Sequence, residues 1–241
     1  MIRIENAEVF GLEAAVRGMR NPKNSWELSD SFLCGNGEGY EYCDIDKKGC
    51  QRVGHEEDFD KPVYCVGKND LKLMQNLVAA GTDHSKFMRM INVTCDITAP
   101  QFWWFEFDTY KVGTVRNSCS KMHKIHVHPF EYDDFSHEGI DEVSNEYDAL
   151  KPFFMEYIDM LEWLRNKFNE TQEKRFWRAL IEMLPEGYNM KATVQLNYQV
   201  FKHMHRVRKN HKLDEWVYFC KWISELPYAK ELITGEELGE V

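Results

Sequence analysis

Residues 87 to 98 read FMRMINVTCDIT, and four apolar side chains in this stretch alternate strictly with polar ones: Ile91, Val93, Cys95 and Ile97. Successive side chains of a β-strand point to opposite faces of a sheet, so this pattern predicts a strand with one buried face. The Ala-Pro pair at positions 99 and 100 then breaks the pattern. The stretch therefore indicates a sheet with a core on one side.

The chain before this strand carries weaker signals. Residues 2 to 10 alternate loosely and predict a first strand, and residues 12 to 19 predict a short helix. Residues 29 to 64 are polar and rich in glycine, and their apolar residues follow no regular period. We expect an irregular insertion at 29 to 64, which could contain a hairpin.

Helical spacing of apolar residues dominates the rest of the chain. Asn69 and Asp70 are expected to cap a helix that Gly81 ends, and the aromatic run 101 to 108 predicts the start of a buried helix. Further helices are predicted over residues 154–168, 176–184, about 192–208 and 213–223. Strands precede helices, so the predicted class is α+β or irregular α/β, a mixed sheet with several long helices in one domain over residues 1–241.

Composition and charge narrow the class of protein. The 241 residues are 43% hydrophobic and 14% aromatic with a net charge of -10, which predicts a folded chain and argues against a general nucleic-acid surface. No apolar stretch approaches the roughly 20 residues needed to span a bilayer, and we expect no signal peptide. The seven cysteines are odd in number and form no Cys-x-x-Cys pair, so we expect free thiols and a cytoplasmic location.

The basic residues are concentrated between Lys202 and Lys212. Asn197 and Arg208 lie eleven residues apart, about three turns of the predicted helix, and would project from one face. An amide and a guanidinium on one face suit a ligand with a polar ring and a phosphate. Alternatively, basic side chains near a helix C-terminus simply complement the helix dipole.

A second polar cluster contains His123, His126 and His128, with acidic residues and His137 following. Imidazole and carboxylate could bind zinc or iron, but the spacing matches no metal-site pattern, and we expect a polar strand edge followed by a solvated acidic loop. The preceding Ser-Cys-Ser-Lys run at 118 to 121 is either a weak nucleophile site or a turn.

Three separated segments resemble those of the flavin-dependent thymidylate synthases, in the same order. In the first, from His84 to Arg89, Arg89 replaces the family's flavin-contacting His ahead of the strand and Ala-Pro pair. In the second, Thr109-Tyr110-Lys111 stands where the family has Arg-His-Arg, and Ser120 follows at a similar distance as the family's Ser.

The third segment is the most specific. Met183-Leu184-Pro185 is similar to the family's Leu-Pro, and the following stretch contains Asn197, His203 and Arg208 at positions of the family's ligand-binding helix. Gln199 stands at the first Arg of that helix. Together, the three segments span roughly residues 70 to 225.

The resemblance implies a flavin-dependent thymidylate synthase-like fold and an FAD-dependent methyltransferase. The family uses FAD and NADPH to transfer a one-carbon unit from methylenetetrahydrofolate to C5 of dUMP, and its members are homotetramers. By resemblance, the nucleotide would be bound by Arg208, Lys111 and Ser120, with Ser120 as a candidate catalytic residue beside it. The flavin would be lined by Arg89, Asn197, His203 and Lys111. A non-catalytic nucleotide-binding or regulatory protein on the same scaffold is the alternative.

Overall fold

The structure is a computed structural model that describes residues 2–34 and 63–235. The chain forms two compact units. The first unit comprises Met1–Ala7, Thr94–Gln195 and His211–Phe219. The second comprises Glu8–Val93, Leu196–Asn210 and Cys220–Val241. A single domain over residues 1–241 stays a prediction.

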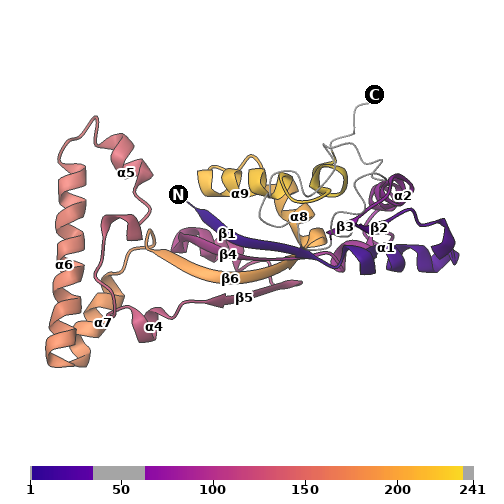
Figure 1. Cartoon of the computed structure of the whole chain (residues 1–241). Coiled ribbons are helices and arrows are strands. Elements are labelled where there is room, and N and C mark those ends of the chain that lie inside the picture. The colour runs from indigo at the N-terminus through magenta and orange to yellow at the C-terminus, as the bar shows by residue number, and fades with distance from the viewer. Residues whose placement is uncertain (1, 35–62, 236–241) are drawn as a thin grey trace. The chain divides into compact units, whose positions relative to one another are not determined.

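A four-stranded sheet provides the framework of the first unit (Figure 1). Its strands lie in the order β1 (Arg3–Phe10), β4 (Asn92–Pro100), β6 (Asn189–Asn197) and β5 (Thr114–Ser118). The predicted alternation is confirmed, because the apolar residues of 91 to 97 are at most 1% exposed while the polar residues between them are half-buried. Backbone amides of Gln101 and Tyr198 donate to carbonyls of Tyr188 and Ile91, so β4 and β6 run antiparallel.

The aromatic run after β4 forms α3 (Gln101–Phe107), as predicted, and buries Trp103 almost completely. The ring centre of Trp103 lies 4.8 Å from that of Trp216 and 5.4 Å from that of Phe219, both on α9 (Asp214–Ser224). Helical spacing from Leu213 and Trp216 would place Val217 on the buried side of α9, but Val217 is exposed and Phe219 is buried.

A second core in the first unit joins two helices that lie side by side in Figure 1, α6 (Leu150–Thr171) and α7 (Lys174–Met183). Their buried residues pack with the segment that precedes them, and this cluster consists of Ile125, Phe130, Phe135, Ile158, Leu161, Leu164 and Leu180. The short helices α4 (Lys121–Lys124), η6 (Tyr132–Asp134) and α5 (Glu138–Val143) complete the unit. Helical spacing therefore predicted α6 and α7 correctly.

The second unit contains short elements from both ends of the chain. They are α1 (Leu12–Arg20), η1 (Asn21–Lys23), η2 (Trp26–Leu28), α2 (Lys68–Ala79), η5 (Lys86–Arg89), α8 (Tyr198–Arg208) and the π-helix η7 (Lys230–Thr234). The ends of the predicted insertion pair as an antiparallel ribbon, β2 (Phe32–Cys34) with β3 (Val63–Cys65). The rest of the predicted insertion, residues 35–62, lies outside the described residues.

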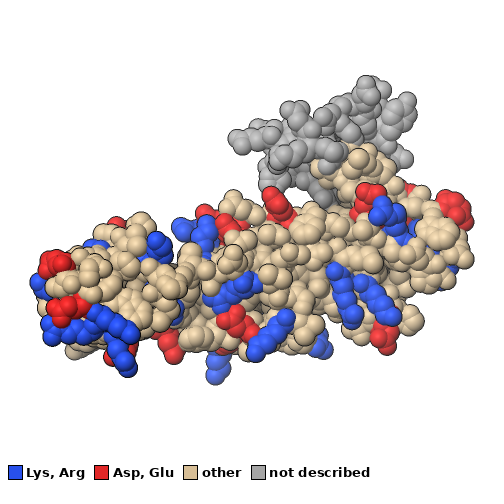
Figure 2. Space-filling model, turned by 90° about the horizontal axis from the view of Figure 1, so that it is seen from below, with Lys and Arg blue, Asp and Glu red and all other residues tan. Residues whose placement is uncertain are grey.

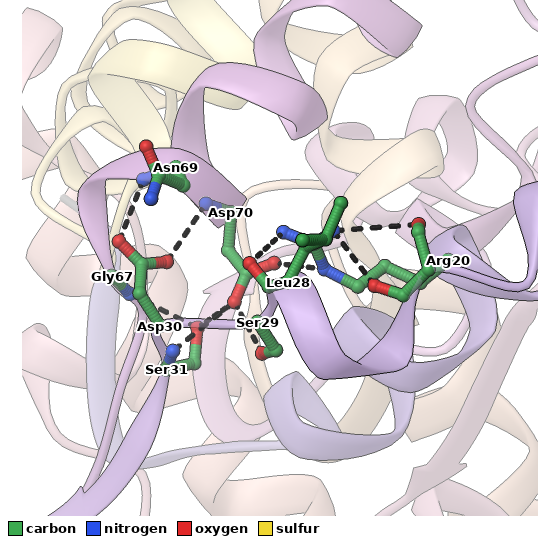
Figure 3. Close-up of polar contacts among 9 residues, drawn as sticks. Arg20, Leu28, Ser29, Asp30, Ser31, Gly67, Asn69 and Asp70 are labelled. Atoms are coloured by element: carbon green, nitrogen blue, oxygen red, sulfur yellow. Dashed lines mark hydrogen bonds and ion pairs between the residues drawn. The ribbon is translucent and has the colours of Figure 1, made fainter.

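A buried ion pair joins α1 to α2 in this unit (Figure 3). Arg20 Nε donates to Asp70 Oδ1 over 2.6 Å, and the two side chains are 5% and 0% exposed. The hydroxyls of Ser29 and Ser31 also donate to Asp70, each over 2.6 Å. The predicted cap at 69 and 70 was wrong, because α2 already begins at Lys68 and the Asp70 carboxylate accepts hydrogen bonds from Arg20, Ser29 and Ser31.

Asp30 takes the capping role instead. Its carboxylate accepts hydrogen bonds from the backbone amides of Asn69 and Asp70 at the start of α2. An acceptor from outside the helix can satisfy these amides as well as a preceding residue does. Sequence reasoning missed this because the acceptor is about forty residues away along the chain.

The helix predicted over about 192–208 was also wrong over its first six residues. Residues 189 to 197 form the strand β6. Its buried residues are Met190, Ala192, Val194 and Leu196, and they alternate with more exposed ones. The helix α8 begins only at Tyr198, where the side chain of Asn197 accepts a hydrogen bond from the backbone amide of Val200. Asn197 is therefore the N-cap of α8 and does not project from the same helical face as Arg208.

Candidate functional site

The first unit contains a cleft of about 640 Å³. Four basic side chains line the cleft, against two acidic ones, Asp133 and Asp134. The basic residues are Arg3, Lys121, Lys124 and Lys191. Figure 2 shows Lys and Arg interspersed with Asp and Glu on one face of the molecule, so the net acidity leaves room for local positive sites. Arg3 pairs with Glu5 over 3.4 Å and Lys191 with Asp96 over 3.2 Å, so Lys121 and Lys124 are the cations of the cleft that suit an anionic ligand.

Lys121 is the most informative of these cations. Its amine donates to the side-chain oxygen of Gln101, and Gln101 in turn donates to the carbonyl of Pro185. Burial, together with the nearby Arg116 guanidinium, lowers the pKa of the Lys121 amine. No carboxylate pairs with Lys121 within the described part of the chain. An anion bound beside this amine would offset the cost of its burial.

Ser120 also lines the cleft, as the N-cap of α4. Its hydroxyl oxygen accepts a hydrogen bond from the backbone amide of His123, and the hydroxyl can still donate to a ligand. The run 118 to 121 is therefore a strand-to-helix turn. The polar strand edge predicted at His123 to His128 was wrong, because the segment begins with α4 and continues as a turn.

Two histidines of the segment from His123 to His137 contact neighbouring side chains of the same unit. His137 Nδ1 lies 2.7 Å from Asp141, and the ring of His126 packs edge-on against Phe168. Over residues 2–34 and 63–235, no group of three or more His, Cys, Asp or Glu side chains is arranged to hold a metal ion.

Two polar atoms at the cleft test whether its chemistry fits a ligand. The side-chain oxygens of Thr98 and Asn189 are buried and have no hydrogen-bond partner among the described residues. Buried polar atoms in native proteins are normally paired, so an orphaned atom at a cleft fits a missing ligand or partner. The basic side chains and the Ser120 hydroxyl form a donor set that fits a phosphate-bearing ligand.

Lys111 lies at a smaller pocket of about 190 Å³ in the same unit. Arg116 lines this pocket as well, lies over the ring of Trp104 at 3.9 Å, and pairs with Asp108 over 2.6 Å. The sequence analysis missed Arg116, because a lone Arg on a short strand carries no signal and its aromatic neighbour is twelve residues away. Thr109 stands where the resemblance places a cation, and its hydroxyl donates to the carbonyl of Glu106.

The other predicted residues lie in the second unit. Arg89 is exposed on η5, which packs against α8, and the Ser85 hydroxyl before η5 donates to Gln199 on α8 over 3.3 Å. His203 is exposed on α8, with its Nδ1 3.3 Å from the Arg206 guanidinium.

Arg208 is half-buried near the end of α8. Burial raises the pKa of the nearby Cys220 thiol to about 11, and the positive charge of Arg208 opposes this shift. The structure thus brings Arg89 and the α8 residues onto adjoining elements of one unit, while Lys111 and Ser120 lie at two pockets of the other unit.

No protein-family model matches the chain, and no curated protein sequence matches it either. Two solved structures of the flavin-dependent thymidylate synthase ThyX from Helicobacter pylori, each with FAD and dUMP, are similar over nearly the whole length. One has a TM-score of 0.61 at 14% identity and covers 97% of this chain and 98% of its own. The other has a TM-score of 0.62 at 15% identity and covers 98% of both chains.

The chain has the ThyX fold. This confirms both the predicted fold class and the fold that the resemblance implied. Identity near 15% establishes a shared fold only, so the ThyX ligands come to this chain as a proposal. Among the described residues, no helix is long and apolar enough to cross a membrane.

Proposed function

We propose that the chain is a ThyX-like flavoenzyme that transfers a one-carbon unit from methylenetetrahydrofolate to C5 of dUMP or a related deoxypyrimidine nucleotide, with NADPH as reductant. The ThyX fold over nearly the whole chain carries this proposal, because the two similar structures hold FAD and dUMP. The cationic cleft at Ser120 adds support, since a nucleotide brings phosphate charge that Lys121 and Lys124 can neutralise.

The residues that would hold the ligands are those at the matching positions. Arg208, Lys111 and Ser120 would bind the nucleotide, with Ser120 beside its reacting ring. Arg89, Asn197, His203 and Lys111 would line the flavin. FAD, when bound, supplies the redox chemistry, and this chain's side chains bind and orient the two ligands. A cytoplasmic homotetramer is part of the same proposal.

The visible spectrum of the purified protein tests the proposal first. Bound FAD is expected to give flavin absorbance, and NADPH oxidation is expected to require both dUMP and methylenetetrahydrofolate. If no flavin is bound, and added FAD changes neither the spectrum nor the melting temperature, the flavoenzyme proposal fails.

A matched pair of variants tests the nucleotide site. Arg208→Ala is expected to lose most of the dUMP-dependent rise in melting temperature, because the phosphate loses its guanidinium partner. Lys209→Ala removes the neighbouring exposed cation at the end of α8 and is expected to retain the rise. Equal rises in both variants would contradict the role of Arg208.

A non-catalytic nucleotide-binding protein is the second candidate, and one observation favours it. Where the family has Arg-His, Thr109 is bonded to the C-terminal turn of α3, and the ring centre of Tyr110 lies 6.1 Å from that of Trp216. The Thr109 hydroxyl satisfies a carbonyl at the end of α3, and the Tyr110 ring packs near Trp216. This candidate predicts stabilisation by dUMP without NADPH oxidation, and measured turnover would exclude it.

A further inference from the structure

The side-chain amide of Gln101 connects a cation of the basic cleft with the protein backbone. Gln101 is the first residue of α3 and is 6% exposed. Its amide nitrogen donates to the Pro185 carbonyl over 3.2 Å, and its amide oxygen accepts a hydrogen bond from the amine of Lys121, which lines the cleft. Gln101 is therefore the partner that holds this amine in place.

Both contacts of Gln101 require the same orientation of its amide. A backbone carbonyl can only accept a hydrogen bond, and an ammonium group can only donate one. The amide nitrogen must therefore face Pro185, and the amide oxygen must face Lys121. A flipped amide would lose both bonds, so the Lys121 amine has a single well-defined acceptor in Gln101.

The backbone around Pro185 does not depend on the Gln101 side chain. The Pro185 carbonyl also accepts a hydrogen bond from the backbone amide of Tyr188 over 3.0 Å. The backbone amide of Gln101 donates to the Tyr188 carbonyl over 3.1 Å, which joins the start of α3 to the turn before β6. Because these backbone bonds remain without the side chain, the side-chain amide is left to orient Lys121.

A neutral partner leaves the charge of Lys121 uncompensated. A carboxylate at position 101 would pair with the ammonium, whereas the amide oxygen stabilises the ammonium without adding negative charge. Burial lowers the pKa of Lys121, and among the described residues Arg116 is the charged group that lowers it further. The titratable groups that share the cleft with Lys121, besides the ion-paired Arg3 and Lys191, are Cys119, Lys124, His128, Asp133, Asp134 and Tyr188.

We infer that Gln101 is a positioning residue of the cleft, which holds the Lys121 ammonium as an uncompensated charge for the phosphate group of a nucleotide. Lys121 touches the ligand, and Gln101 acts through Lys121. The inference rests on the proposed function for the identity of the ligand, but it requires neither flavin nor turnover. Phosphate binding by an ammonium is strongest while the amine is protonated and weakens as the pH rises through its pKa.

Paired binding measurements isolate the phosphate contact. Because dUMP and deoxyuridine differ only in the phosphate, the ratio of their dissociation constants reports that contact and cancels effects of the shared ring. Wild type is expected to prefer dUMP about a hundredfold at about pH 7.5 and to lose this preference at higher pH. Lys121→Met should reduce the preference about tenfold, and Lys121→Arg should keep it at high pH because a guanidinium stays protonated.

Two substitutions of Gln101 should move this pH dependence in opposite directions. Gln101→Met removes the acceptor of the ammonium, so the preference for dUMP should be lost at a lower pH than in wild type. Gln101→Glu supplies a carboxylate, so the loss should come at a higher pH, while the preference at about pH 7.5 falls because the charge is already paired. Gln75→Met makes the same change on α2, which contributes no residue to the cleft, and should match wild type.

A purely structural Gln101 would leave the pH dependence where wild type has it, even if the melting temperature changed. That result, or a wild type that does not prefer dUMP to deoxyuridine, would overturn the inference. A lack of bound flavin or of NADPH oxidation would instead overturn the proposed enzyme, and the binding ratios would still decide the role of Gln101.

Discussion

Replacement of Asp70 by Ala should cost this protein a large part of its stability. Asp70 is fully buried and is the charged partner of Arg20, which is 5% exposed. After the substitution, the Arg20 guanidinium keeps only the backbone carbonyls and hydroxyl of the segment that ends at Leu28. Removal of one partner of a buried ion pair typically costs about 3–5 kcal/mol because it leaves an uncompensated charge.

The expected loss lies toward the lower end of that range, at about 3 kcal/mol, because the Leu28 and Ser25 carbonyls still solvate Arg20. Ser29 is exposed, and its hydroxyl can turn to water when Asp70 is removed. Urea unfolding followed by circular dichroism measures the difference. The double variant Arg20→Met with Asp70→Leu, which removes both charges, should be more stable than Asp70→Ala alone.

The pH dependence follows from the same contacts. Burial raises the pKa of Asp70, but hydrogen bonds from Ser29, Ser31 and Arg20 outweigh it and leave the pKa below its usual value. The stabilisation is therefore complete above the unfolded pKa, near 3.9, and is lost as pH falls through the lower folded pKa. An Asp70→Ala loss below about 1 kcal/mol, or a double variant less stable than the single, would refute this account.

Three other changes test packing and charge elsewhere. Gly11→Ala should destabilise the protein by more than about 2 kcal/mol in urea unfolding, because φ is +91° and a Cβ would lie 2.0 Å from the Met90 carbonyl oxygen. Tyr198→Phe should cost about 1–2 kcal/mol in the same assay, since the buried hydroxyl donates to the Pro227 carbonyl over 2.6 Å. Hydrogen bonds hold the pKa of Asp96 at about 2, so wild type should lose stability relative to Asp96→Asn between about pH 4 and pH 2, as followed by melting temperature.

Much of the local structure could be predicted because its cause is local. The alternation from Ile91 to Ile97 follows from the two faces of a strand, and the structure shows the predicted buried face. The helix α6 follows from apolar spacing in the same way. The prediction for residues 192 to 197 was wrong, because this strand runs directly into the helix α8. Its two-residue apolar period was therefore read as the start of the helical period. Pairing with β4 made the segment a strand.

The candidate site could be predicted only in part. The motif order pointed to Ser120 and Arg208, and the run 118 to 121 contains Lys121, but no local pattern marked Arg116 or the burial of Lys121. Their importance arises from contacts with Gln101 and Trp104, which are twenty and twelve residues away. A side chain's pKa and charge balance depend on what surrounds it in space.

The sequence by itself determined many of the elements and the family resemblance, because strand and helix periods and motif spacing are properties of neighbouring residues. Tertiary structure alone decided that Asp70 is a buried anion for Arg20, that Asp30 caps α2, and that the basic cleft collects side chains from β1, α4 and β6. These features join residues from distant parts of the chain, and only folding brings such residues within bonding distance.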